Sequence, residues 1–167
     1  MTLETERLLL RPLEDGDLDG LMEIFSDPEA MRHYPGTKTR EEGAAWLAWC
    51  QGLSPFGLHA AVLREDGTLA GQCGLIPQEV DGERELEIGY LFIRRHWGKG
   101  LATEAAAAWR DHGFALGRSR LISIIDPGNQ PSIRVAERIG MRLHHETEKF
   151  GKHVRIYAVE RPAGGGG

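Results

Sequence analysis

Two glycines and three cations stand at the start of a predicted helix, in the segment RRHWGKGLATEAAAAW (residues 94–109). A helix start leaves four backbone N–H groups without partners, and a Ser, Thr, Asp or Asn side chain usually accepts from them. The first half of this segment holds no such residue. The same end of a helix carries positive potential, which disfavours Arg94, Arg95 and Lys99 there. A bound anion would answer both features, so the sequence predicts an anion site at Gly98–Thr103.

Glycine lacks a Cβ, so Gly98 and Gly100 would let a phosphate approach the backbone closely. A Walker loop needs GxxxxGK followed by Ser or Thr, and it is excluded because Gly100 follows Lys99. A dinucleotide-binding fingerprint is a weaker alternative, because Thr103 occupies its third glycine position and would push the helix off the strand. A tight turn without any ligand is the remaining alternative.

Acidic residues precede the glycines on a predicted strand from about Glu85 to Ile93. The period of two places Glu85 and Glu87 on one face and Tyr90 and Phe92 on the other. We therefore expect one of the two carboxylates to face a cleft near the glycines, where it can serve as a proton acceptor.

A second polar pair opens the next predicted helix, in NQPSIRVAERIG. Asn129 and Ser132 both favour helix starts, and Pro131 suits the first turn. A capping role and a role in chemistry both remain open for this pair.

The elements around these residues follow from hydrophobic spacing and turn signals. A strand is expected at residues 6–13, a helix from Leu18, and a second helix opened by the capping box of Thr39 and Glu42. Hairpin turns at residues 66–67 and 81–82 then join three antiparallel strands. Later come a helix to about residue 116, a strand at 120–125, a helix to 140 and two strands turning at 151. This order predicts an α+β fold with a mixed sheet and not a regular βαβ repeat.

Length and composition limit the class of protein. The 167 residues suggest one domain over residues 1–162, followed by a flexible Gly-rich tail at 163–167. A net charge of −5 argues against nucleic-acid binding, and no apolar run approaches the ~20 residues that span a membrane. The first residues do not resemble a signal peptide, so we expect a cytoplasmic protein. Neither the two cysteines nor the seven histidines have a spacing that indicates a metal site.

Three segments together resemble one enzyme family. LEIGYLFIRRHWGKGLATEA and NQPSIRVAERIGMRL closely resemble the GNAT superfamily of acyl-CoA-dependent N-acyltransferases, and the opening ETERLLLRPLEDGDLDGL is similar to its ribosomal-protein N-terminal acetyltransferase branch. The resemblance reaches to about residue 160. It implies a mixed, mostly antiparallel sheet of about seven strands with about four helices, and two strands splayed apart at the cofactor site.

The same resemblance implies acetyl-CoA as the cofactor and no metal. The pyrophosphate motif of the family can be laid on Trp97, Gly100 and Ala102 or on Arg95, Gly98 and Gly100, and we prefer the first. Trp97 then stands where the family has Gln or Arg. Residues implied to bind the cofactor are Tyr90, Phe92, Trp97, Gly98, Lys99, Gly100, Leu101, Ala102, Thr103 and Asn129.

For catalysis, the resemblance implies direct attack of an amine on the thioester. Glu87 would draw the amine proton through water, and Ser132 would protonate the leaving thiolate, because Ala136 stands where many members have a Tyr. Tyr34 and Trp46 are candidates for the acceptor pocket. The acceptor is a protein N-terminal α-amine or a small-molecule amine, and a homodimer is left open. A non-catalytic acyl-CoA-binding module is the alternative function, ahead of a dinucleotide-binding enzyme.

Overall fold

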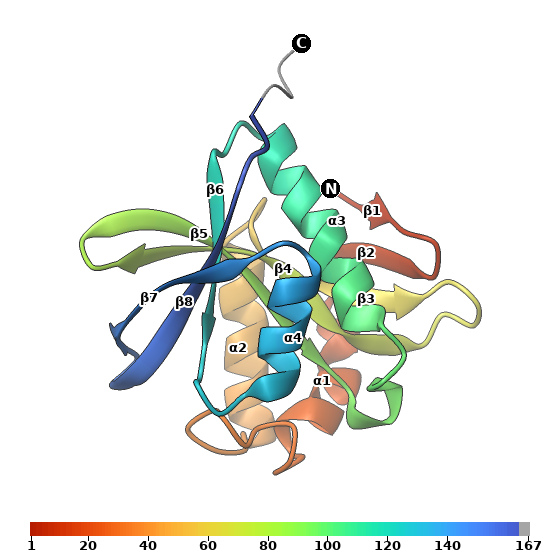
Figure 1. The fold of residues 1–167 in the computed structure, drawn as a ribbon. Helices are drawn as coiled ribbons and strands as arrows, with labels where there is room; N and C mark the ends of the chain where they lie inside the picture. Colours follow the sequence, from red (N-terminus) through yellow and green to blue (C-terminus); the bar gives the residue numbers. More distant parts are fainter. Residues whose placement is uncertain (164–167) are drawn as a thin grey trace.

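A mixed sheet forms the centre of the fold, and helices cover both of its faces (Figure 1). The structure is a computed structural model that describes residues 1–163, so the predicted tail at 163–167 lies outside the described residues except for Ala163. The sheet has eight strands in the order β1-β2-β3-β4-β5-β6-β8-β7. The strands are β1 (Leu3–Glu4), β2 (Leu8–Pro12), β3 (Gly57–Leu63), β4 (Leu69–Val80), β5 (Glu83–Phe92), β6 (Arg120–Ile125), β7 (Arg142–Lys149) and β8 (Lys152–Glu160).

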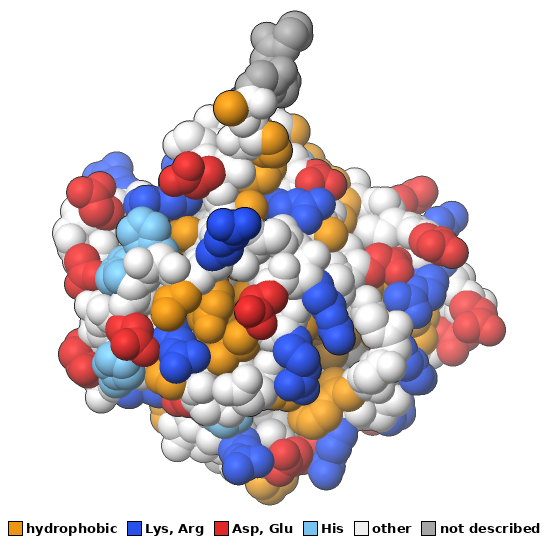
Figure 2. Space-filling model, in the orientation of Figure 1, with side chains coloured by type: hydrophobic (Ala, Val, Ile, Leu, Met, Phe, Trp, Pro, Cys, Tyr) orange, Lys and Arg blue, Asp and Glu red, His pale blue; other side chains and the backbone are white. Residues whose placement is uncertain are grey.

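Four α-helices cover the sheet, two on each face (Figure 1). They are α1 (Leu18–Phe25) and α2 (Arg40–Gly52) on one face, and α3 (Leu101–Ala115) and α4 (Gln130–Arg138) on the other. Short 3-10 helices, η1 (Asp15–Asp17) and η2 (Arg94–His96), precede α1 and α3. In the space-filling view, acidic and basic side chains are interspersed over the α3–α4 face, with apolar side chains between them (Figure 2).

Each face of the sheet has its own apolar core. Trp109 of α3 is 1% exposed and packs with Ile88 and Leu121 on the α3–α4 face. Phe25 of α1 and Leu47 of α2 pack with strand residues on the opposite face. Burial of these large side chains is the main contribution that holds the helices on the sheet.

The sheet is interrupted between β5 and β6. These neighbouring strands run parallel, and Glu87 and Ile122 form their single register pair. One step further along, the buried Ser123 hydroxyl donates to the carbonyl oxygen of Ile88, at 2.8 Å. Beyond this point the two strands diverge, as predicted for the cofactor site.

The predicted order of elements is confirmed, with small differences at the ends. The sheet has eight strands where about seven were expected, because the two-residue β1 pairs with β2 through Leu3 and Leu10. The capping box at the start of α2 is present, since Thr39 Oγ1 accepts from the Glu42 N–H and Glu42 Oε1 from the Thr39 N–H. Within residues 1–163, no helix is long and apolar enough to cross a membrane.

Gly74 of β4 provides a test of how closely β3 and β4 pack. A Cβ on Gly74 would overlap the carbonyl oxygen of Gly57 and lie 2.9 Å from Cα of Leu58. Gly74→Ala should therefore lower the free energy of unfolding by about 1–3 kcal/mol, measured by urea denaturation. Gly52→Ala is the control, because a Cβ there meets nothing within 4 Å. Equal stability of the two variants would contradict this packing.

Candidate functional site

The start of α3 has no side-chain cap, as the sequence predicted. Gly100 is the N-cap residue, with φ 78° and ψ 10°, and no side chain bonds to the first turn. Gly98 is also left-handed, with φ 76°, a conformation that L-residues other than glycine rarely adopt. The first bond of the helix runs from the Glu104 N–H to the Gly100 carbonyl oxygen, at 3.0 Å. The N–H groups of residues 101–103 are therefore left without intrahelical partners.

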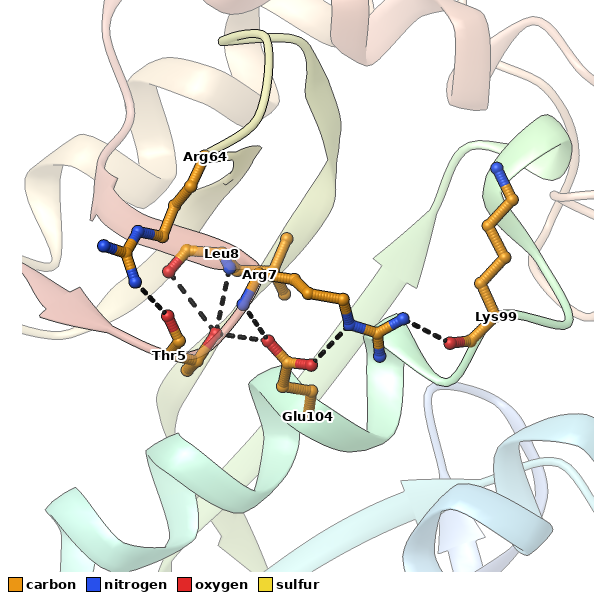
Figure 3. Close-up of polar contacts among 6 residues, drawn as sticks. All are labelled: Thr5, Arg7, Leu8, Arg64, Lys99 and Glu104. Carbon is orange, nitrogen blue, oxygen red and sulfur yellow. Dashed lines mark hydrogen bonds and ion pairs between the residues drawn. The ribbon is translucent and has the colours of Figure 1, made fainter.

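A polar network holds this helix start against the N-terminal strands (Figure 3). Arg7 donates its Nε to Glu104 Oε1 and its Nη1 to the Lys99 carbonyl oxygen, each at 2.8 Å. Glu104 also accepts from the backbone N–H of Arg7 and from the Thr5 hydroxyl. The network fixes the loop on both sides of Gly100, so its geometry does not depend on a ligand.

The charge of Glu104 matters for this network. Burial alone would raise the pKa of Glu104, but the hydrogen bonds from Thr5 and Arg7 and the Arg7 charge outweigh it and lower the pKa. A carboxyl group whose pKa is lowered by folding stabilises the fold above its ordinary pKa. This contribution is lost as pH falls through the lowered value.

Two of the three cations at the helix start have partners of their own. Arg94 pairs with Asp27 at 2.8 Å and Arg95 with Glu23 at 2.9 Å, so both turn toward α1 and the segment that follows it. Among residues 1–163, the Lys99 side chain has no ion pair within 4.0 Å. The missing cap, more than the cluster of cations, is therefore what distinguishes this helix start.

Trp97 ties the glycine loop to the end of β5. Its Nε1 donates to the carbonyl oxygen of Phe92 at 2.8 Å, and 43% of the residue is exposed. The Phe92 side chain is buried in the core, so only its backbone can face a ligand. The indole N–H is likewise in use, so Trp97 would contact a ligand through its ring.

The divergence of β5 and β6 leaves backbone groups of β5 unpaired by β6. The Ile93 N–H, just after β5, donates to the carbonyl oxygen of Ala70 in β4, at 2.9 Å. In an antiparallel ladder such pairs alternate, so odd-numbered residues of β5 bond to β4 and even-numbered ones face β6. The N–H and C=O of Tyr90 and the N–H of Phe92 thus face the opening between the strands. The family resemblance implied that Tyr90 and Phe92 bind the cofactor where two strands splay apart, and their backbone groups lie at such an opening.

A cavity of about 560 Å³ occupies this opening. Its wall combines apolar and aromatic side chains with polar groups from several elements, as in small-molecule sites. Both predicted catalytic residues line it, as do Tyr34, Trp46, Tyr90 and Asn129. The predicted residues of the glycine loop do not line it and form a separate part of the site. The polar and ionisable wall residues are His33, Tyr34, Trp46, Gln72, Glu87, Tyr90, Ser123, Asp126, Asn129, Ser132 and Lys152.

Of the two candidate carboxylates, Glu87 faces the cavity and Glu85 does not. Glu85 pairs with Arg120 of β6, away from the cavity wall. Glu87 Oε1 accepts from Gln78 Nε2 at 3.0 Å. Burial raises the pKa of Glu87, opposed in part by the Gln78 hydrogen bond and by the backbone N–H of Ile124. A raised pKa makes the Glu87 carboxylate a stronger base than an exposed one.

Tyr34 lies close enough to Glu87 for their charges to interact. Packing around its hydroxyl and the Glu87 charge raise the pKa of Tyr34 to about 12, although 43% of the residue is exposed. Tyr34 is therefore a neutral hydroxyl at neutral pH, able to donate or accept a hydrogen bond.

Ser132 and Asn129 lie at the start of α4, on the cavity wall. Asn129 caps the helix, because its Oδ1 accepts from the Ser132 N–H at 3.3 Å. The Tyr90 hydroxyl donates to the Ser132 carbonyl oxygen at 2.7 Å and so joins α4 to β5. Ala136, in contrast, is fully buried in the core and does not line the cavity.

Sequence reasoning missed two glutamines of β4, Gln72 and Gln78. The contact between Gln78 and Glu87 could have been inferred from the predicted turn at residues 81–82. The hairpin register pairs Gln78 with Glu85, and Glu87 is the next residue of β5 on the same face. Gln72 had no comparable signal, since the partner of its side chain, Trp46, lies on α2. In the part of the chain that the structure describes, no three His, Cys, Asp or Glu residues are placed to hold a metal ion.

Comparison with known proteins gives one consistent match. Residues 7–142 match the model of the acetyltransferase (GNAT) domain. The chain is 41% identical over 165 residues to the uncharacterized protein YkkB of Bacillus subtilis, covering 93% of each chain. Its fold is similar to that of a GNAT-family acetyltransferase from Bacillus anthracis, with a TM-score of 0.83, 30% identity and coverage of 96% and 98%.

One solved structure with lower sequence identity is described as a complex with coenzyme A. RimL, described as a ribosomal L7/L12 alpha-N-protein acetyltransferase in complex with coenzyme A, has a TM-score of 0.78 and 18% identity, covering 96% of this chain and 98% of that one. At this identity the similarity concerns the fold alone.

Gly100→Ala tests the loop as an anion site. A Cβ on Gly100 would project into the loop, 3.5 Å from Arg7 Nη2, and we expect the affinity for acetyl-CoA to fall about tenfold or more in a calorimetric titration. Gly117→Ala is the matched control: it follows the same helix, has φ 93°, and a Cβ there meets nothing within 4 Å. Both substitutions place alanine at a left-handed φ, so an equal affinity for acetyl-CoA in both would contradict an anion site at Gly100.

Proposed function

Because the chain belongs to the GNAT acetyltransferase family, we propose that it transfers an acetyl group from acetyl-CoA to a primary amine. The observation that carries the proposal is the cavity at the divergence of β5 and β6, with Glu87 and Ser132 on its wall. The uncapped start of α3 follows directly on β5 and supplies a place for the phosphates of the cofactor. We further propose that residues 1–162 form a single catalytic domain.

The residues present fit acetyl-CoA. The free N–H groups of residues 101–103, with Gly98 and Gly100 beside them, would hold the pyrophosphate, and the Lys99 ammonium would add a positive charge. The unpaired backbone groups of Tyr90 and Phe92 would bind the amide-bearing arm, and Asn129 lies further along the same cavity. Bound acetyl-CoA supplies the acetyl group as a thioester.

The side chains on the cavity wall match the needs of acyl transfer. Glu87, whose pKa is raised by burial, takes the proton of the amine, directly or through water. A backbone N–H of β5 at Tyr90 or Phe92 stabilises the oxyanion. The Ser132 hydroxyl donates a proton to the departing sulfur. These roles make the chain an enzyme and not a non-catalytic acyl-CoA-binding module.

The proposal allows two kinds of acceptor, a protein N-terminus and a small amine. The similarity of the segment ETERLLLRPLEDGDLDGL to the ribosomal-protein N-terminal acetyltransferase branch supports the first. The cavity of about 560 Å³, with Trp46 and Tyr34 on its wall, supports the second.

Glu87→Gln and Ser132→Ala test the catalytic roles. Each should lower kcat/KM by about tenfold or more, which is ~1.4 kcal/mol of barrier, while acetyl-CoA still raises the melting temperature. Glu83→Gln is the control for charge, because Glu83 lies on the same strand, exposed and outside the cavity wall. Unchanged turnover in both variants would contradict the proposed roles. Absence of turnover in the unmodified chain despite binding would favour the non-catalytic module.

The pH dependence separates a base from a merely polar residue. The carboxylate is the active form, so kcat/KM should rise with pH through the pKa of Glu87, which lies above its ordinary value. In Glu87→Gln this rise should disappear and leave only the titration of the acceptor amine. A Glu87→Gln profile parallel to that of the unmodified chain would exclude Glu87 as the base.

A further inference from the structure

Gln72 of β4 has a buried side-chain amide whose oxygen has a hydrogen-bond partner and whose amino group has none among the described residues. Its Oε1 accepts from the Trp46 Nε1 at 3.1 Å, and the residue is 0% exposed. An indole N–H can only donate, so the oxygen must face Trp46 and the amino group must face away. Among the residues that the structure describes, Gln72 Nε2 has no hydrogen-bond partner.

This amide borders the same cavity as Glu87 and on the same side of the sheet. Gln72 pairs with Leu91 and Ile76 pairs with Glu87, so the two positions are four residues apart along the ladder and share a face. Four residues of strand span about 13 Å. Trp46, Leu58 and Leu91 line the wall, so the surface near Gln72 is apolar.

An unpaired buried donor is costly, whereas an apolar residue of the same shape at this position would cost little. Trp46 holds the amide in the one orientation that turns its amino group away from the indole. A ligand oxygen that accepts from Gln72 Nε2 would complete the hydrogen bonding of the amide. Glu87, which would bind the amine, is a carboxylate, whereas Gln72 offers an N–H donor. The two ends of the cavity therefore recognise different groups of a ligand.

Lys152, the first residue of β8, joins two other segments of the cavity wall. Its Nζ pairs with Asp126, after β6, and donates to the His33 carbonyl oxygen at 3.0 Å, in the loop before α2. All three residues line the cavity, so the start of β8 is tied to the segment after β6 and to the loop before α2. The cavity that these contacts border has a volume of about 560 Å³, which suits a small acceptor.

We propose that the acceptor is a small primary amine with an apolar body and a distal oxygen that accepts a hydrogen bond from Gln72 Nε2. Because the two positions are four residues apart along the ladder, the apolar body of the acceptor separates its amine from its oxygen. Gln72 is then the residue that selects oxygen-bearing amines, with Trp46 as its positioning residue. This inference rests on the proposed acetyl transfer.

Matched amines test the inference. Benzylamine and 2-phenylethylamine are each compared with their 4-methoxy derivatives, in which the added oxygen can only accept a hydrogen bond. The release of coenzyme A from acetyl-CoA is measured for the unmodified chain and for Gln72→Leu. Spermidine and a short peptide with a free N-terminus complete the set of acceptors.

We expect the unmodified chain to prefer at least one methoxy amine over its parent by about tenfold in kcat/KM, because the parent leaves the Gln72 donor unpaired. Gln72→Leu should lose this preference with little change toward the parent amines. Gln51→Leu is the matched control, since Gln51 of α2 lies outside the cavity wall, and it should keep the preference. Gln72→Met repeats the test if the leucine variant does not reach the melting temperature of the unmodified chain.

The outcomes distinguish the two levels of the proposal. Equal kcat/KM for the methoxy and parent amines, or a preference that survives in Gln72→Leu, would overturn the role of Gln72. Turnover of spermidine or of the peptide alone would overturn the small apolar acceptor but leave acetyl transfer intact. No release of coenzyme A with any amine would count against the proposed function itself.

Discussion

The parallel strands β5 and β6 pair at one position, Glu87 with Ile122, and then diverge. The rest of the site depends on the gap that this divergence leaves in the sheet. A buried sheet normally pairs its backbone groups, so a gap between neighbouring strands needs other partners for them. The Ser123 hydroxyl donates a hydrogen bond to the carbonyl oxygen of Ile88, and the Trp97 indole N–H donates one to the carbonyl oxygen of Phe92. Between these two contacts the edge of β5 is free to bind a ligand. The same gap opens a cavity through the sheet, so groups on both of its faces reach one space.

Two kinds of polar interaction keep this arrangement in place without a ligand. The Arg7–Glu104 network fixes the glycine loop against the N-terminal strands (Figure 3). The hydrogen bond from Tyr90 to the Ser132 carbonyl fixes α4 against β5. Both connect segments that are distant in sequence, so the fold holds the proposed phosphate-binding end and the proposed reacting end of the site in place. This preorganisation reduces the ordering that binding would otherwise require.

The sequence predicted the elements and the glycine loop because those depend on local signals. The capping box at Thr39, the hairpin turns and the missing cap before Leu101 each lie within a few residues, and each is present in the structure. The alternation on β5 narrowed the candidate base to two carboxylates. It could not choose between them, because the choice depends on Arg120, a residue of β6 that pairs with Glu85. The partners of Arg94 and Arg95 and the contact between Gln72 and Trp46 were missed for the same reason, since each joins elements that only tertiary packing brings together.

The central claim is that the backbone N–H groups at the start of α3 receive the phosphates of acetyl-CoA, and the most direct measurement is an NMR titration of the ¹⁵N-labelled chain with coenzyme A. We predict that the amide resonances of Leu101, Ala102 and Thr103 shift strongly downfield as hydrogen bonds to phosphate form. Resonances of Leu116 and Gly117, at the other end of the helix, should change little. Binding that leaves the three amides of the first turn unshifted would contradict the claim.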